Sequence, residues 1–171
     1  MNRKLSGKKL KKSNKKNKTA VEIVFVLENL EYARNVASVF NLAYALKVSK
    51  IYLTGITTTP PFGKELMKVS RGHEKSIAHD YAKNITKLLE KLMKEDFQII
   101  ALGKTNNSVE FSKLRDGATY KKVAIIVGNE KQGLSNLLLN KADLRVFVPV
   151  YRPLGHLNIV NELAVVAYNI I

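Results

Sequence analysis

Two polar loops follow apolar runs in the last third of the chain. The run at 122–127 leads into GNEKQGLS at 128–135, and the run at 144–150 leads into PVYRPLGHLN, which ends at Asn158. Polar loops at the carboxyl ends of buried strands are where open α/β sheets bind small molecules. Neither loop matches a dinucleotide fingerprint or a P-loop, which disfavours nicotinamide and nucleoside triphosphate chemistry.

Three side chains in these loops have chemical capacity. Asn129 and Glu130 can hydrogen-bond a ligand or an RNA hydroxyl. The alternative is a plain turn between a strand and a helix, in which the glycines adopt positive φ. His156 has an intrinsic pKa of about 6.5 and can accept a proton at neutral pH. The alternative for His156 is a loop residue that hydrogen-bonds a carbonyl group.

A third polar group starts the final apolar segment. Asn158, Asn161 and Glu162 are spaced i, i+3 and i+4, so they share one face of a helix. A buried carboxylate is costly unless it is paired. Glu162 therefore either faces a dimer partner or solvent, or it lines a ligand or substrate pocket.

Composition removes several classes of function. The 171 residues include no Cys and three His, which excludes disulfides and thiolate catalysis and disfavours a metal site. No apolar run reaches the roughly 18 residues of a membrane span, and the Lys-rich start lacks the apolar region of a secretory signal. We expect a cytoplasmic protein that binds neither a membrane nor a metal.

The net charge of +15 is concentrated at the start of the chain, where residues 1–18 hold nine Lys and Arg and no acid. Such a segment cannot bury apolar surface, so we expect 1–19 to be a disordered tail before one domain at 20–171. The tail suits a nucleic acid, because neutralised phosphates release counterions. A solubilising tail and an organellar signal are the alternatives. The candidate RNA-binding residues are Lys8, Lys9, Lys11, Lys12, Lys15, Lys16 and, in the domain, Arg34.

Apolar periodicity predicts the elements that position these residues. Near-continuous β-branched runs alternate with amphipathic segments, which predicts an α/β fold with a mostly parallel sheet of about five strands covered on both faces. The predicted strands are 21–27, 50–55, 97–102, 122–127 and 144–150. The predicted helices are 30–46, 76–96 and 157–171.

Three motifs taken together resemble one family. Residues matching its GNExxGLS motif are Gly128, Asn129, Glu130, Gly133, Leu134 and Ser135. Residues matching a later motif are Pro149, Leu157 and Asn158, and those matching an early motif are Glu28, Asn29, Asn35 and Ala43. Over about residues 21–171 the chain resembles the SpoU/TrmH branch of the SPOUT-class RNA ribose 2′-O-methyltransferases.

The resemblance implies a Rossmann-like sheet whose C-terminal part forms a trefoil knot around S-adenosylmethionine. It also implies a homodimer and a ribose 2′-hydroxyl of tRNA or rRNA as the substrate. The residues that would hold the cofactor are Leu102, Gly103, Val127, Gly128, Gly133, Val148, Val150, Leu157 and Asn158. Asn35, Glu130 and Asn158 would position the ribose or support the site.

The chain departs from the family at two candidate catalytic positions. Asn41 stands where the family has a key Arg, and His156 stands where it has Ser. Asn is neither titratable nor cationic, so it cannot act as a base. An active enzyme with rearranged groups would use His156 as the proton acceptor, or Arg34, which lies about 10 Å along the helix from Asn41.

Two other hypotheses explain the same departures. The chain can be an inactive homologue that keeps the knot as an RNA-binding module. It can also methylate an acceptor that needs no help from Arg, such as a ring nitrogen with its own lone pair. The sequence favours an S-adenosylmethionine-dependent ribose 2′-O-methyltransferase, with the RNA-binding module as the alternative.

Overall fold

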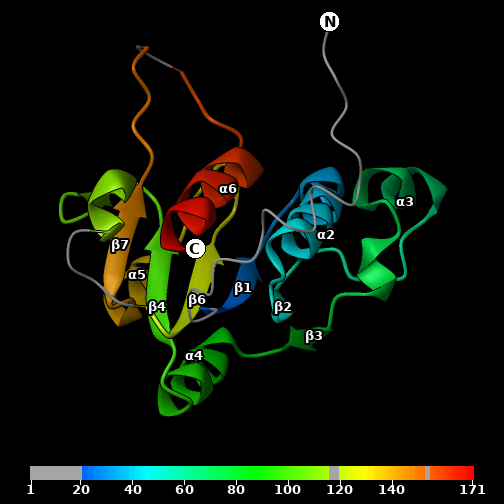
Figure 1. The fold of residues 1–171 in the computed structure, drawn as a ribbon, viewed down its shortest axis with the longest axis horizontal. Helices are drawn as coiled ribbons and strands as arrows, with labels where there is room; N and C mark the ends of the chain where they lie inside the picture. Colours follow the sequence, from blue (N-terminus) through cyan, green and yellow to red (C-terminus); the bar gives the residue numbers. More distant parts are fainter. Residues whose placement is uncertain (1–20, 116–119, 153–154) are drawn as a thin grey trace, which may run out of the picture.

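A parallel sheet of seven strands forms the centre of the computed structural model, which describes residues 21–115, 120–152 and 155–171 (Figure 1). The strand order is β3-β2-β1-β6-β4-β7-β5, and every pairing is parallel. The strands are β1 (Glu22–Glu28), β2 (Lys50–Thr54), β3 (His79–Ala82), β4 (Gln98–Leu102), β5 (Val109–Glu110), β6 (Lys122–Val127) and β7 (Leu144–Phe147).

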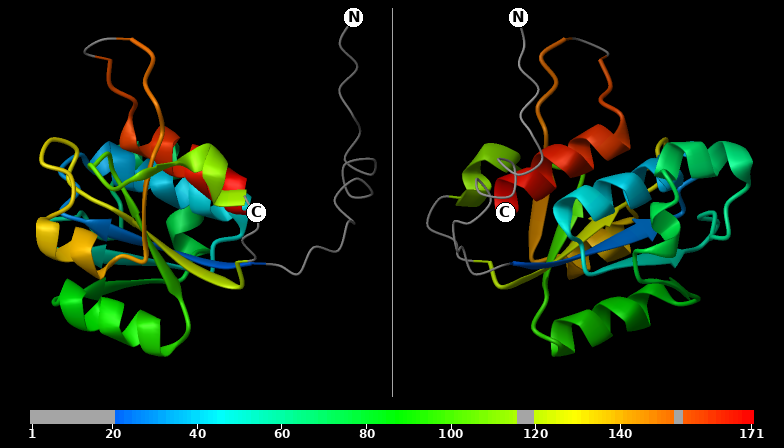
Figure 2. Two further views of the ribbon diagram at one scale, coloured as in Figure 1. Left: turned by 90° about the vertical axis from the view of Figure 1, so that its left-hand side faces the viewer. Right: turned by 45° about the vertical axis from the view of Figure 1, so that its right-hand side comes forward.

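Helices cover both faces of this sheet (Figure 2). The α-helices are α2 (Ala33–Leu46), α3 (Lys64–Ser70), α4 (Ile85–Lys94), α5 (Asn136–Lys141) and α6 (Ile159–Ile170). The 3₁₀ helices are η1 (His73–Lys75) and η2 (Phe111–Arg115). In the described part of the chain, no helix is both long enough and apolar enough to cross a lipid bilayer.

Alternation along β1 divides the core into two layers. Phe25 and Leu27 pack with α2, α6 and η2, whereas Val24 and Val26 face α4 and α5. Both layers are apolar, because a parallel strand in the middle of a covered sheet is buried on both sides. The predicted α/β class and parallel sheet are confirmed, and the trefoil knot stays a prediction.

The predicted helix at 76–96 is wrong over its first half. Residues His79–Ala82 form β3, which pairs in parallel with β2, and the helix begins only at Ile85. Tyr81 belongs to the apolar stripe of the predicted helix, yet its side chain is exposed. Its hydroxyl donates a hydrogen bond to the Gly55 carbonyl oxygen at 2.8 Å. A strand pairing with a distant segment thus overrides the local helical period.

The other predicted elements are confirmed as helices or strands, and their first or last residues differ from the prediction. Helix α2 begins at Ala33 and α6 at Ile159, two to three residues later than predicted. Strand β7 ends at Phe147, before Pro149, which has no backbone N–H to donate to a sheet. The prediction of about five strands missed the two edge strands, β3 and β5.

The start of α4 can be tested by removing its cap. Asn84 accepts a hydrogen bond from the backbone N–H of Lys87 at 3.0 Å, so Asn84→Ala should lower the free energy of unfolding by about 1 kcal/mol in urea titrations. Ser76, exposed and outside the helix, is the matched control, and Ser76→Ala should change stability by less than about 0.5 kcal/mol. An effect of Asn84→Ala no larger than that of Ser76→Ala would contradict the cap.

Candidate functional site

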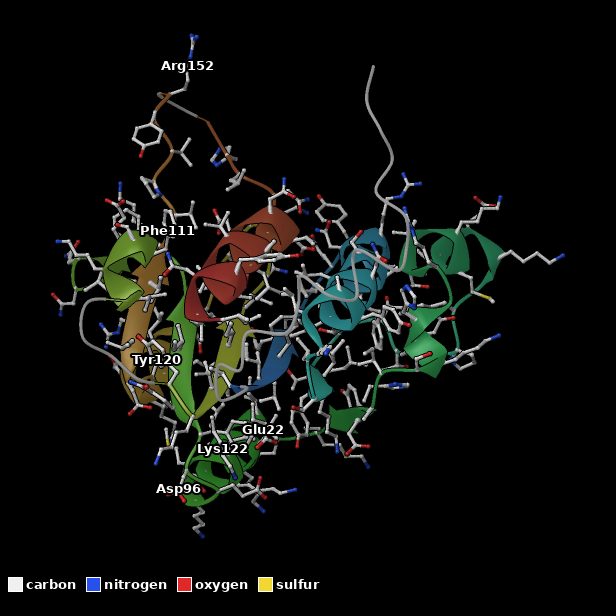
Figure 3. The ribbon with its side chains drawn as sticks, viewed as in Figure 1. Glu22, Asp96, Phe111, Tyr120, Lys122 and Arg152 are labelled. Atoms are coloured by element: carbon white, nitrogen blue, oxygen red, sulfur yellow. The ribbon has the colours of Figure 1, made fainter. Side chains whose placement is uncertain are left out.

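Two adjoining cavities open at the carboxyl ends of β1, β4 and β6, as expected for an α/β sheet. The larger has a volume of about 790 Å³ and the smaller of about 330 Å³. They share the lining residues Gly103, Lys104, Val150, Gly155 and Glu162, so they form one continuous cleft. Residues from the described parts of the segment between β7 and α6, among them Val150 and Gly155, line the cleft, and Arg152 lies on the part of this segment that projects from the body (Figure 3).

The Glu130 carboxylate joins the loop after β6 to the start of α2. It accepts hydrogen bonds from the backbone N–H groups of Glu31 and Tyr32 at 2.9 and 3.2 Å, and from the Asn35 amide at 2.8 Å. Tyr32 is the N-cap position of α2, and its own side chain makes no capping hydrogen bond. Glu130 therefore caps this helix from about 100 residues away, where a negative charge also favours the helix dipole.

These bonds fix the charge of Glu130. Partial burial acts to raise the pKa of its carboxyl, but the hydrogen bonds from Glu31, Asn35 and Tyr32 outweigh burial and lower the pKa. Glu130 is thus held as a carboxylate whose acceptor capacity is directed at α2. This arrangement suits a structural anchor of the site better than a group that must take up a proton.

Asn35 connects this anchor to α6. Its side-chain oxygen accepts a hydrogen bond from the Asn158 amide nitrogen at 3.1 Å. The Asn158 side-chain oxygen accepts one from the backbone N–H of Val160 at 2.9 Å and so caps α6. The chain of contacts Glu130–Asn35–Asn158 ties three segments of the cleft together.

The turn after β6 requires glycine at two positions. A side chain at Gly128 would come within 2.5 Å of the Gly133 carbonyl group, and Gly133 has φ of +67°. Asn129 stabilises the turn, because its side-chain oxygen accepts from the backbone N–H groups of Lys131 and Gln132 at 2.9 and 3.0 Å. Its amide donates to the Asn29 carbonyl at 2.9 Å and holds the turn against β1.

Most of the predicted site residues line the cleft. Those in the larger cavity are Asn35, Leu102, Gly103, Gly128, Glu130, Gly133, Val150, His156, Leu157 and Asn158. Val148 lines the smaller cavity. Val127 is buried within β6, Asn41 is half-buried on α2 and Arg34 is exposed, and these three line neither cavity. The six predicted tail lysines lie outside the described residues.

Sequence reasoning missed several lining residues. Lys104 lies in both cavities, and its ammonium group is 5.7 Å from the centre of the Phe147 ring. Lys131 lines the larger cavity and pairs with Glu31 at 2.7 Å. Lys131 occupies a position of the GNExxG motif where any residue is allowed, so the motif does not predict that this residue lines the cleft. Across the described ranges, no cluster of three or more His, Asp or Glu could hold a metal ion.

The fold is that of the SPOUT RNA methyltransferases. An AdoMet-bound rRNA methyltransferase from Sinorhizobium meliloti matches 87% of this chain and 55% of its own, with a TM-score of 0.73 and 22% identity. The A. aeolicus TrmH/SpoU tRNA modifying enzyme matches 95% of this chain and 79% of its own, also with a TM-score of 0.73 and 22% identity.

The family follows from the sequence match. The model of the SpoU rRNA Methylase family matches residues 22–168, so the chain belongs to this family. An uncharacterized tRNA/rRNA methyltransferase of Mycobacterium bovis is 26% identical over 85% of this chain and 50% of its own length. A protein of Staphylococcus haemolyticus named as a TrmH family tRNA/rRNA methyltransferase is 26% identical over 86% of this chain and 56% of its own. The chain spans about half the length of these curated relatives.

The cross-sheet cap gives a pH-dependent prediction. Glu130→Gln should lower the free energy of unfolding by about 1–2 kcal/mol near neutral pH, because a charged acceptor of helix N–H groups is lost. The folded pKa lies below the ordinary value of 4.5, so the wild-type advantage is complete above that value and disappears as the pH falls through the folded pKa.

Urea unfolding at a series of pH values measures this difference. Glu65→Gln is the control, since its ion pair with Lys68 is exposed and should contribute less than about 0.5 kcal/mol. A Glu130→Gln penalty that is constant with pH would show that the charge of Glu130 does not stabilise the fold.

Proposed function

We propose that the chain is an S-adenosylmethionine-dependent RNA methyltransferase that modifies the 2′-hydroxyl of a ribose in tRNA or rRNA. One observation carries the proposal: Glu130, Asn35 and Asn158, drawn from three separate motifs, meet in one cleft through direct hydrogen bonds. Family membership and the names of the relatives support the same activity.

The cleft fits the cofactor in size and in lining. Its larger cavity, of about 790 Å³, lies within the usual range for ligand pockets of roughly 300–1,000 Å³. Val148, Val150 and Leu157 offer apolar walls for a nucleoside, and a side-chain position at Gly103 would meet open space, so its backbone is approachable. When bound, the cofactor supplies an electrophilic methyl group on a sulfonium sulfur.

The chain's own residues would position the two reactants. Asn35 and Asn158 line the cleft, and their mutual hydrogen bond leaves other amide hydrogens and lone pairs for a ribose hydroxyl. Lys104 places positive charge at the cleft for phosphate groups of RNA. Alignment of this kind is a large part of catalysis, because it replaces a bimolecular encounter with an ordered geometry.

Asn41 favours a second candidate, an RNA-binding module without catalysis. Asn41 replaces the Arg that the family resemblance places in the reaction, and it lies outside the lining of both cavities. A pseudoenzyme would keep the Glu130 anchor, because the anchor stabilises the fold. The enzyme and the RNA-binding module therefore predict different results for methyl transfer and the same effect of Glu130 on the free energy of unfolding.

We further propose a cytoplasmic homodimer whose C-terminal segment is knotted. Support for association comes from exposed apolar side chains on α2 and α6, with 52% of Tyr44 and 59% of Tyr168 accessible. Sedimentation measurements across a concentration series would test the dimer.

The activity is tested by binding followed by transfer. Calorimetry should show S-adenosylmethionine binding, and a labelled methyl group should pass to total RNA from a strain in which the gene for this chain is deleted. Digestion to nucleosides should then locate the label on ribose. Asn158→Ala should reduce transfer at least tenfold through loss of its bond to Asn35, whereas Asn161→Ala, exposed and outside both cavities, should not.

The possible results separate the hypotheses. Label on a base would contradict ribose methylation and favour the ring-nitrogen acceptor. Cofactor or RNA binding without any transfer would contradict the enzyme and favour the RNA-binding module.

We also propose that the Lys-rich tail contacts RNA phosphates. Deleting residues 1–18 should weaken RNA binding and flatten its dependence on salt, by about 0.7–0.9 in the log–log slope for each phosphate that the tail neutralises. Filter binding over a salt series measures both quantities. An affinity and slope equal to those of the full chain would contradict a nucleic-acid role for the tail.

A further inference from the structure

Two carboxylates line the cleft, and their surroundings differ. Glu130 is engaged with α2 and Asn35. Among the side chains that the structure describes, none donates a hydrogen bond to the Glu162 carboxylate or lies within ion-pair distance of it. Two carboxyl groups in one site whose environments separate their proton affinities commonly divide their roles, one as a fixed charge and the other as an acid or base.

Glu162 occupies the junction of the two cavities. It lies in the first turn of α6, four residues after the N-cap Asn158, and therefore on the same face of the helix. It lines both the larger cavity, with Asn35 and His156, and the smaller cavity, with Val148. If the nucleoside and the acceptor occupy the two cavities, Glu162 lies between them.

The described cationic side chains near Glu162 form no ion pair with its carboxylate. Those lining the cleft include Lys104, which lies near the Phe147 ring, and Lys131, which pairs with Glu31. Arg152 lines the smaller cavity with Glu162, but its side chain extends away from the body of the protein (Figure 3), and His156 is exposed.

Among their described side chains, the elements packed against α6 add no partner. Arg34 on α2 and Lys113 on η2 are exposed, and Lys122 of β6 lies at the opposite end of its strand, near Glu22. Tyr32 also lines the larger cavity, and its backbone N–H is directed at Glu130. Burial without compensation raises the pKa of the Glu162 carboxyl. A carboxyl with a raised pKa is a stronger base, and it remains ionised once the pH exceeds that value.

We propose that Glu162 is the proton acceptor of the methyl transfer, an inference that rests on the proposed function. The acceptor hydroxyl oxygen forms a bond to the methyl carbon while the carbon–sulfur bond breaks and its electron pair stays on sulfur. The hydroxyl proton passes to the Glu162 carboxylate and is then released to water. This assignment supplies the base that Asn41 cannot provide, and it replaces His156 in that role.

The test compares four variants with the wild-type protein. Glu162→Gln removes the base at nearly constant shape, and Glu162→Asp keeps a carboxylate on a shorter side chain. His156→Gln tests the competing base, and Glu90→Gln on the opposite face of the sheet is the control. Calorimetry with S-adenosylmethionine and S-adenosylhomocysteine reports folding and cofactor binding separately from activity.

Single-turnover transfer to the same RNA, at saturating cofactor and over a pH series, gives the decisive comparison. Glu162→Gln should bind both cofactor forms within about threefold of wild type and lose at least about 100-fold in rate, with Glu162→Asp recovering part of the loss. The wild-type rate should rise with pH and reach a plateau, and this rise should be missing in Glu162→Gln. Carbon-13 NMR of the cofactor-free protein should show the Glu162 carboxyl titrating at the midpoint of that rise.

Three results would overturn the assignment. The first is a Glu162→Gln rate within threefold of wild type, or a pH profile that disappears in His156→Gln instead. The second is weaker cofactor binding with an unchanged rate at saturation, which would make Glu162 a cofactor ligand. The third is a wild-type protein that binds the cofactor and transfers no methyl group, which would overturn the proposed reaction itself. Transfer that persists in Glu162→Gln overturns the proton acceptor alone.

Discussion

The Glu130 carboxylate holds together parts of the chain that are about 100 residues apart, and the geometry of the cleft depends on this contact. It replaces the local cap that α2 lacks, and through Asn35 it reaches Asn158 and the start of α6. The same few atoms thus align two helices and shape a ligand cavity. Stability and function are coupled here, because removal of the carboxylate would disturb both.

The carboxyl pKa values of Glu130 and Glu162 shift in opposite directions because their hydrogen-bond partners differ. A carboxylate that accepts several N–H hydrogen bonds keeps its charge and gains little from a proton. A carboxylate that is partly buried without donors binds a proton more readily. Both kinds of carboxylate line the larger cavity: Glu130 accepts N–H hydrogen bonds, and Glu162 accepts none from the described side chains. The family motifs alone do not predict this combination. In the proposed reaction, Asn41 at the position where the resemblance implies an Arg therefore does not require that proton transfer be lost.

Much of the fold could be predicted from the sequence, because its central strands are continuous apolar runs. The apolar runs at 122–127 and 21–27 favour buried strands of a covered sheet, and the structure confirms strands at Lys122–Val127 and Glu22–Glu28. Strand β3 could not be predicted in this way. Its residues His79–Ala82 are half polar and gain their conformation from pairing with β2 at the edge of the sheet.

Part of the candidate site could also be predicted from the sequence. Gly128 and Asn158 could be located because motif letters mark a backbone turn and a local helix cap. Glu130 was located by the motif match alone, since its cap on α2 is made from about 100 residues away. Lys104 and Lys131 could not, since their place at the cleft depends on how separate loops meet. Asn41 and Val127 were proposed from their alignment to family motifs, and the structure places both outside the lining.

The strand order also has a consequence for biosynthesis. Strand β1 pairs on one side with β2, which follows it closely, and on the other side with β6, which lies about 100 residues later. During translation one edge of an apolar strand must therefore remain unpaired until most of the chain has left the ribosome. Contacts of such long sequence separation form slowly, and open apolar edges promote aggregation. The unpaired edge of β1 is therefore open to intermolecular pairing until β6 emerges.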